Sequence, residues 1–479
     1  MNVRVRATAV AATVVAATCC AVAWAQAPET LLVAAGPSGS ADNAAISQDK
    51  RSATIVAFDS AAPDLVDGDA NGQRDVFVLR RAQPFGLDGA PWQPGALALV
   101  SHAASGAPAN GPSHDPALSG DSRTAPGCVA FISDASNLVP GDTNGKPDAF
   151  VAYLGSGRIV RVSVSSTGAQ ANGASYAVAV DGRCRRVAFI SDAGNLYQQT
   201  SPEPSRNALR TTAPPPGSRQ VYVRGLGGPT GIDKAIAGVT FMLTARGRQA
   251  ANGSTANIAM APNGKNLAFD TTATNLDPRD PGATRDVYAT TLTRIYLRKR
   301  KGRRPQTFRR DTTLVSRDAS GPGDGASSNP AISADAKTVA FTTAAANLVA
   351  GASADVTQIA VANMTTGAIA LGSHPSGQRA TPGDGPSDNA TLTVGGDFVA
   401  YDTAARNIPV SAAGGAAAGD VRSVMIGAQG SGTAILVSQG PAGPLPTPSA
   451  RAATSAHGNY VVFSSGEPSS VLLRYVGPR

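Results

Sequence analysis

Short apolar runs recur along the whole chain, and each is bounded by Gly, Asp, Asn or Pro. Within the runs β-branched residues are frequent, and apolar positions often alternate with polar ones. This composition and this alternation are typical of half-buried strands. The pattern therefore predicts an all-β chain of many short strands joined by tight turns.

One of these runs ends in Ala-Phe, or a close variant, followed by Ser or Thr, and it recurs seven times. Five copies read VAFDSAAPDL, VAFISDASNL, VAFISDAGNL, LAFDTTATNL and VAFTTAAANL, a sixth reads VAYDTAARNI, and the last, VVFSSGEPSS, keeps only the strand. The aromatic residues of the seven copies are Phe58, Phe131, Phe189, Phe269, Phe341, Tyr401 and Phe463. Such a period indicates a repeat architecture.

Each repeat is predicted to contain four strands, named a to d in chain order. Examples are 331–333 for strand a, 75–78 for strand c and 99–101 for strand d, with the aromatic run as strand b. The seventh repeat stops after its strand c at 471–473, whereas an unmatched strand stands at 30–33. We therefore expect a seven-bladed β-propeller of four-stranded blades, closed by the N-terminal strand, which completes the last blade and removes exposed edges.

Composition agrees with this architecture. The 479 residues include 52 Gly and 34 Pro, and only 15% are charged, against about 25% in an ordinary soluble protein. A coiled coil or helical bundle, which needs Ala, Glu, Lys and Leu at helical spacing, is excluded.

Residues 1–25 read as a secretory signal peptide. Arg4 and Arg6 precede an uncharged apolar stretch, and Ala23 and Ala25 form an A-x-A cleavage site. We therefore expect export to the periplasm or secretion.

Residues 26–479 are expected to form a single propeller domain with insertions at about 197–218 and 291–311. No later segment is long and apolar enough for a transmembrane helix. A lipoprotein anchor at Cys19 or Cys20 is the alternative, but the Leu expected three positions before the modified Cys is missing.

The frame APNGKNLAF, residues 261–269, resembles the repeat S-P-D-G-K-x-x-A-F of TolB-like (PD40, WD40-like) β-propellers. The frame NLVPGDTNGKPDAFV, residues 137–151, is similar to a repeat of exported bacterial proteins of that superfamily, most of which have no assigned function. The resemblance implies the fold and says little about activity. TolB itself carries an α/β domain before a six-bladed propeller, so its cellular role is not carried over.

The loops that connect strand d to the next strand a carry a second repeat of Asn-Gly or Asp-Gly, which favours tight turns. They share one face of a propeller with the b–c loops. Two interpretations stay open: the side chains satisfy backbone groups in turns, or they form a polar funnel for a ligand. The candidate ligand-binding residues are Asn110, His114, Asp115, Asn172, Asn252, Asp324 and Asp384.

The segment DGDANGQRD is the best metal candidate. Asp67, Asp69 and Asn71 have the 1-3-5 spacing of a calcium loop, and Asp75 lies at position 9. An EF-hand needs Glu at position 12, where this chain has Val78. Calcium is the candidate ion, and an Asx-rich turn is the alternative. No cofactor is required by any other motif.

No nucleophile elbow, P-loop or H-E-x-x-H motif is present. The interpretation favoured is an exported, monomeric, non-catalytic scaffold that binds a protein, peptide or glycan. The first alternative is a periplasmic hydrolase or lyase with a funnel site near His114 and Asp115. The second is a calcium-dependent adhesion module.

Cys128 and Cys184 remain after signal cleavage, at the same end of neighbouring blades. In an oxidising compartment they are expected to form a disulfide, and two free buried thiols are the alternative.

Residues 291–310 hold nine Lys and Arg and no acid, which exceeds the net charge of +8 for the whole chain. The rest of the chain is therefore near neutral, and the segment is either a solvated loop or a contact for an anionic envelope polymer. The candidate polyanion contacts are Arg298, Lys299, Arg300, Lys301, Arg303 and Arg304.

Overall fold

The computed structural model describes residues 30–34, 39–49, 53–82, 92–121, 123–197, 209–229, 231–296, 306–408 and 421–477. The predicted signal peptide and the predicted polyanion contacts, from Arg298 to Arg304, lie outside these residues. Within them, no helix is long and apolar enough to span a membrane.

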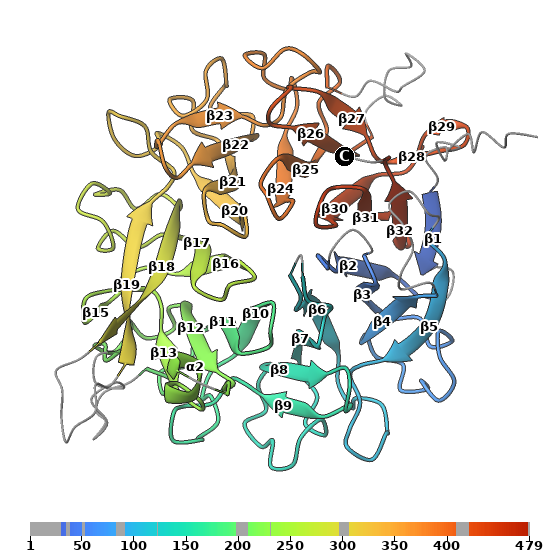
Figure 1. Cartoon of the computed structure of the whole chain (residues 1–479), viewed down its shortest axis with the longest axis vertical. Coiled ribbons are helices and arrows are strands. Elements are labelled where there is room, and N and C mark those ends of the chain that lie inside the picture. Colours follow the sequence, from blue (N-terminus) through green and yellow to red (C-terminus); the bar gives the residue numbers. More distant parts are fainter. Residues whose placement is uncertain are drawn as a thin grey trace, which may run out of the picture.

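Seven antiparallel four-stranded sheets stand as blades around a central axis (Figure 1). Blades 1 and 2 are β2 (Ala41–Ile46), β3 (Ile55–Ser60), β4 (Asp75–Arg81), β5 (Pro94–Leu99), and β6 (Ser113–Leu118), β7 (Cys128–Ser133), β8 (Asp148–Tyr153), β9 (Ile159–Arg161). Blades 3 and 4 are β10 (Ser175–Val180), β11 (Arg186–Ser191), β12 (Gln220–Gly225), β13 (Thr240–Met242), and β16 (Thr255–Met260), β17 (Asn266–Thr271), β18 (Asp286–Tyr296), β19 (Gln306–Leu314).

The remaining blades repeat this order, with the first strand innermost (Figure 1). Blades 5 and 6 are β20 (Ser327–Ile332), β21 (Thr338–Thr343), β22 (Gln358–Asn363), β23 (Ile369–Leu371), and β24 (Ser387–Leu392), β25 (Phe398–Thr403), β26 (Ser423–Ala428), β27 (Ala434–Leu436). Blade 7 is β30 (Ser449–Thr454), β31 (Tyr460–Ser465), β32 (Ser470–Tyr475) and β1 (Thr30–Ala34).

The N-terminal strand closes the ring as expected. Strand β1 pairs antiparallel with β32, from Thr30 opposite Arg474 to Ala34 opposite Val471. Blade 7 therefore consists of three strands from the end of the chain and one from its beginning, which Figure 1 shows in red and blue.

A few short elements lie outside the blades. They are the helix α2 (Gly231–Ala235) and two small sheets, β14 (Ala245–Arg246) with β15 (Gln249–Ala250), and β28 (Gln439–Gly440) with β29 (Gly443–Pro444).

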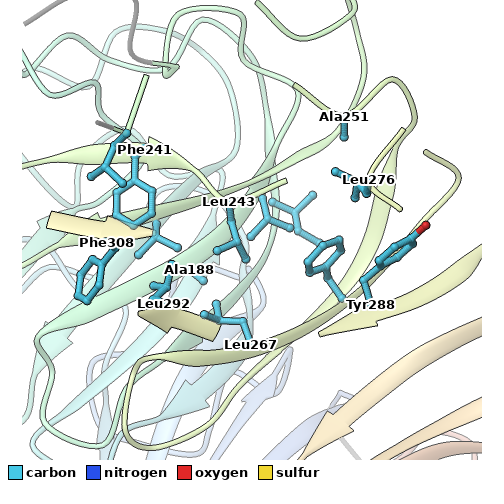
Figure 2. Close-up of a cluster of buried hydrophobic side chains, with 14 of the residues drawn as sticks. Ala188, Phe241, Leu243, Ala251, Leu267, Leu276, Tyr288, Leu292 and Phe308 are labelled. Atoms are coloured by element: carbon cyan, nitrogen blue, oxygen red, sulfur yellow. The ribbon is translucent and has the colours of Figure 1, made fainter. Parts of the chain in front are cut away.

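The hydrophobic core lies between the faces of neighbouring blades. Each repeated aromatic residue of the second strand is fully buried, and in blades 1 to 4 it stacks on an aromatic residue of the third strand, as Phe58 does on Phe77 at 5.7 Å. Figure 2 shows one such cluster between blades 3 and 4, where Phe241 and Phe308 pack with Leu267 and Leu292. The aromatic residue of the repeat therefore anchors each blade to its neighbour.

Two sequence predictions about strand limits are corrected. The inner strand of blade 5 begins at Ser327, before the predicted start at Ala331, because a bulge lets the strand continue through Asn329. For the same reason His114 and Asp115 belong to the inner strand β6 and not to a d–a loop.

The predicted insertion at 291–311 is in part regular structure. Strands β18 and β19 extend beyond the blade as a long hairpin, paired as far as Tyr296 opposite Gln306. Arg310 donates from its guanidinium to the carbonyls of Met242 and Gly247, at 2.7 and 2.6 Å. The described part of this basic segment is thus held against blade 3.

Candidate functional site

The inner strand of every blade carries a β-bulge at the same point. The pairing register between the first and second strands shifts once in each of the seven blades. In five blades the bulged residue has a positive φ, a conformation that Asn and Asp tolerate better than other residues with side chains. These five residues are Asn43, Asp115, Asn329, Asn389 and Arg451.

The bulges aim their side chains into the mouth of the central channel. A cavity of about 510 Å³ there is lined by residues from all seven inner strands. Its polar lining residues are Asn43, Asp115, Tyr176, Asn257, Asn329, Asn389, Thr391 and Arg451. The rest of the lining is Ala, Val, Ile and Pro, so a polar ring, called the amide ring for its four Asn side chains, surrounds a small apolar surface.

A buried carboxylate in blade 4 holds this ring in place. The side chain of Asp270 is fully buried and accepts hydrogen bonds from Asn257 Nδ2 at 2.6 Å and from the backbone N–H of Asn329, in the next blade, at 3.2 Å. Arg285, just before the third strand, forms an ion pair with it at 2.6 Å. Asp270 therefore fixes two bulges and joins two blades.

Blades 1 and 6 repeat the arrangement. Asp59 accepts from Asn43 Nδ2 at 2.8 Å and from the N–H of Asp115, in blade 2, at 3.0 Å, and pairs with Arg74. Burial raises the pKa of Asp59, although these hydrogen bonds and the charge of Arg74 oppose the rise. In blade 6, Asp402 pairs with Arg422.

Neighbouring bulges also contact one another across the channel mouth. Arg451 donates to Asn43 Oδ1, and Asn329 Nδ2 lies 3.3 Å from Asn389 Oδ1. These contacts order the amides and leave a ring that presents both donors and acceptors toward the cavity.

One ionisable pair lies beside the ring. His114 Nδ1 is 2.9 Å from Asp115 Oδ2, and both side chains are partly exposed. The hydrogen bond with Asp115 raises the pKa of His114 against the opposing effect of burial, so the imidazolium form is favoured near Asp115. Of the predicted ligand-binding residues, the structure brings Asp115 to the channel, with His114 bonded to it.

Blade 3 differs from the other blades because its inner strand presents Tyr176. The guanidinium of Arg219 lies 3.7 Å from the centre of the Tyr176 ring, and the phenol donates to Asp192 at 2.6 Å. The ring face toward Arg219 is thus covered.

The predicted loop residues form a second set of contacts. The N–H of Asn110 donates to Asn137 Oδ1 at 3.0 Å, and Asn137 Nδ2 donates to the carbonyl of Pro108 at 3.0 Å. Four other blades repeat this clasp, and their pairs are Asn172 with Asn195, Asn252 with Asn275, Asp324 with Asn347, and Asp384 with Asn407.

The side chains of the five predicted loop residues are used in these clasps as well. Asn110 Oδ1 accepts from the N–H of Ser136 at 2.8 Å, and Asp384 Oδ1 accepts from that of Arg406 at 2.6 Å. Each clasp joins a blade's entry to its own b–c loop. Ligand binding by these loops stays a prediction.

The predicted calcium loop is the b–c loop of blade 1, between β3 and β4. Asp69 and Asp75 are buried, Asn71 is partly buried, and Asp67 is exposed. Asn71 Nδ2 donates to Asp75 and to the carbonyl of Ala109 at 2.9 Å. Burial raises the pKa of Asp75 to about 6.

The two cysteines form the predicted disulfide. Cys128, at the start of β7, is joined to Cys184, in the turn before β11, with their Cα atoms 6.2 Å apart. Blades 2 and 3 are thereby covalently linked.

A further cavity of about 620 Å³ lies at the opposite end of the ring and is lined by residues of blades 2 to 6. Two of its arginines, Arg185 and Arg186, share one carboxylate, because both pair with Asp233. Asp181, which also lines it, accepts from the backbone N–H groups of these arginines. The side chains that line this cavity therefore form a network of internal ion pairs and hydrogen bonds.

Sequence reasoning missed most of the amide ring. Asn43, Asn257, Asn329, Asn389 and Arg451 were not singled out, although all stand at the third position of an inner strand. The signal was present as a short frame, a small residue followed two positions later by Asn or Asp, as in SDNA and SSNP. It reads as a turn unless the bulge is recognised.

Comparisons with known proteins concern the fold. No family model matches the chain, and no curated protein matches it. The chain is a seven-bladed β-propeller. TolB from Acinetobacter baumannii, of the kind whose repeat the sequence resembles, is among the solved structures similar to it, with 14% identity over 80% of this chain and 63% of that chain and a TM-score of 0.39.

Two similar structures come from enzymes. An oligogalacturonate lyase from Vibrio parahaemolyticus shares 11% identity over 94% of this chain and 97% of that chain, with a TM-score of 0.49. A puromycin-hydrolyzing peptidase from Mycobacterium tuberculosis shares 14% identity, with a TM-score of 0.47, and the match covers 90% of this chain and 51% of the peptidase.

Proposed function

We propose that this chain is an exported, non-catalytic binding propeller that holds a peptide segment in the mouth of its central channel. The observation that carries the proposal is the ring of bulged Asn residues, which are locked by buried Asp residues and aimed into one cavity. A site built on fixed inner strands is preorganised, so little ordering opposes binding. Export rests on the predicted signal peptide.

The chemistry of the ring supports a peptide. A carboxamide presents one acceptor and two donors, which match the N–H and C=O groups of a peptide backbone. The cavity of about 510 Å³ lies in the range of roughly 300–1,000 Å³ typical of ligand sites. The Ala and Pro residues between the amides supply small apolar contacts for side chains of the ligand.

A glycan is the less supported ligand. Sugar faces are apolar and pack well on exposed aromatic rings, but the one aromatic residue of the lining is Tyr176. Its ring is covered by Arg219.

The hydrolase or lyase alternative is supported by a single pair, His114 and Asp115, within hydrogen-bonding distance at the channel mouth. A His oriented by a carboxylate is a general base in many enzymes. Cleavage of a bound peptide, with loss of cleavage in His114→Ala, favours this alternative over a scaffold.

The test is a screen of the purified chain against displayed random peptides and a glycan array, followed by affinity measurement with the best binder. The double variant Asn329→Gly, Asn389→Gly keeps the positive φ and removes two amides, so we expect about tenfold to hundredfold weaker binding. The matched control is Asp324→Asn, Asp384→Asn, which removes two charges from the loops and keeps the side-chain acceptors that Asn110 supplies in blade 2.

Unchanged affinity in the glycine variant, with a loss in the clasp variant, moves the site to the loops and contradicts the proposal. If the chain binds glycans and no peptide, the proposed peptide ligand is wrong and the ligand class is a glycan.

A further inference from the structure

The b–c loops of blades 1, 2 and 4 each place an aspartate six residues before the first residue of the third strand. The pairs are Asp69 and Asp75 in blade 1, Asp142 and Asp148 in blade 2, and Asp280 and Asp286 in blade 4. Asp69, Asp142 and Asp280 occupy one equivalent loop position, and Asp75, Asp148 and Asp286 begin the third strands, so the three blades allow a direct comparison.

In blade 2 an arginine lies between the two acids. Arg161 Nη1 is 2.8 Å from Asp142 Oδ1 and 3.4 Å from Asp148 Oδ2, and its side chain is 10% exposed. Gln170 accepts from the same nitrogen at 2.9 Å and supports the guanidinium. The buried charge of this acid pair is therefore compensated by a fixed internal cation.

In blade 4 a phenol takes part. The hydroxyl of Tyr288 donates to Asp280 Oδ2, and the N–H of Gly282 donates to Asp280 Oδ1 at 3.2 Å. Both oxygens of Asp280 therefore have a donor.

Blade 1 has neither group. Leu99 pairs with Phe77 as Arg161 pairs with Phe150, so Leu99 occupies the arginine position. Phe77 itself stands where blade 4 has Tyr288, since both face the repeated aromatic residue. Pro108 occupies the position of Gln170 in the same sequence frame.

Asp69 therefore lacks the arginine or phenol that the equivalent aspartate contacts in blades 2 and 4. Asp69 is 4% exposed, and its Oδ1 is buried with no hydrogen-bond partner. An orphaned carboxylate oxygen is costly, and in the other two blades the equivalent group is satisfied. A cation at this point restores what Arg161 provides in blade 2.

We propose that Asp69 and Asp75 bind a calcium ion at the position that the Arg161 guanidinium occupies in blade 2. Carboxylates, a backbone carbonyl and water are the ligands that calcium accepts with flexible geometry. Asn71 Nδ2 donates to Asp75 Oδ2, and the hydroxyl of Ser101 donates to Asp75 Oδ1 at 2.5 Å. These two hydrogen bonds fix the orientation of the carboxylate.

The expected affinity is modest. Among the described residues, no group of three or more His, Cys, Asp or Glu side chains is placed to hold a metal ion. Two carboxylates correspond to the weak class of extracellular calcium sites, with a Kd of about 10⁻⁴–10⁻³ M. Such a site is filled outside the cytoplasm, where we expect this chain to act.

The experiment is calorimetric titration of the full chain with CaCl₂ after chelator treatment, with the melting temperature measured in parallel. Wild type is expected to bind one calcium ion and to melt at a higher temperature with calcium. Asp69→Asn is expected to weaken binding at least tenfold. Asp142→Asn, the matched blade 2 variant, is expected to bind calcium like wild type.

A second variant installs the internal cation. Leu99→Arg with Pro108→Gln copies blade 2 into blade 1 and is expected to abolish calcium binding and the calcium-dependent rise in melting temperature. If that variant fails to fold, the comparison of Asp69→Asn with Asp142→Asn still decides.

No binding heat in wild type up to 10⁻² M, an Asp69→Asn variant that binds like wild type, or equal affinity for MgCl₂ overturns the calcium assignment.

Discussion

The seam between blades 4 and 5 and the seam between blades 2 and 3 are closed by different chemistry at opposite ends of the second strand. In blade 4, Asp270 near the end of β17 reaches the N–H of Asn329 in blade 5. In blade 2 the equivalent position is Ile132, whose hydrocarbon side chain cannot accept a hydrogen bond. There the tie is the disulfide of Cys128, at the other end of the strand.

The two seams show that the tie between neighbouring blades can differ both in chemistry and in its position along the second strand. The carboxylate tie depends on the buried charge of Asp270, which Arg285 compensates. It also orders the channel mouth, because Asn257 and Asn329 donate to the same carboxylate. The disulfide acts mainly by restricting the unfolded chain, and it lies at the end of the strand away from the bulges.

Removing the carboxylate is expected to have the largest effect. Asp270→Ala leaves Arg285 and the N–H of Asn329 without their acceptor, and we expect a loss of about 3–5 kcal/mol in the free energy of unfolding. Denaturant titration measures it. The double variant with Arg285→Met is expected to recover part of the loss, and a cost below about 1 kcal/mol for Asp270→Ala contradicts a stabilising tie.

Removing the disulfide is expected to cause the second-largest loss of stability. Cys128→Ala with Cys184→Ala opens a link across a sequence separation of 56 residues, for which we expect about 2–4 kcal/mol of lost stability. The same denaturant titration applies, and wild type under reducing conditions serves as its match. Equal stability of reduced and oxidised protein argues that the apolar contacts of Ile132 suffice.

The smallest effect is expected at a buried acid that has no paired cation among the described residues, Asp286. Asp286 is fully buried, Ser316 donates to it at 2.7 Å, and burial raises its pKa to about 6. Because the folded pKa is above the ordinary value of 3.8, the stability present below pH 3.8 is lost as the pH rises through about 6.

Asp286→Asn removes this loss. Relative to wild type we expect the variant to gain about 1–2 kcal/mol between pH 4 and pH 7.5, measured as unfolding free energy against pH. Asp270→Asn, at an acid paired with Arg285, is the control and is expected to lose stability at neutral pH. A flat difference between wild type and Asp286→Asn means that Asp286 keeps an ordinary pKa in the folded protein.

Much of the fold was predictable because its signals are local. The aromatic residue before Ser or Thr marks each second strand, and the unmatched strand at Thr30 predicted the closure with β32. The bulges were not predicted, since Asn329 before Pro330 has the composition of a turn, and only the pairing register places it inside a strand.

The candidate site was predictable only in part for the same reason. Asn137 and Asn329 are similar in local sequence, yet one closes a clasp within its blade and the other faces the channel. The unpartnered oxygen of Asp69 was also hidden, because Leu99 and Arg161 become equivalent only through strand register. The residue types could be read from the sequence, but which of them face the channel depends on the strand register.

Ring closure by β1 also sets an order of assembly. Arg474 donates to the hydroxyl of Thr30, which lies 444 residues earlier in the chain. Blades 1 to 6 consist of consecutive strands and can form locally, but the seventh sheet waits for both ends. Until β1 pairs with β32, each of these two strands has an unpaired edge, so ring closure also protects the chain from edge-to-edge association.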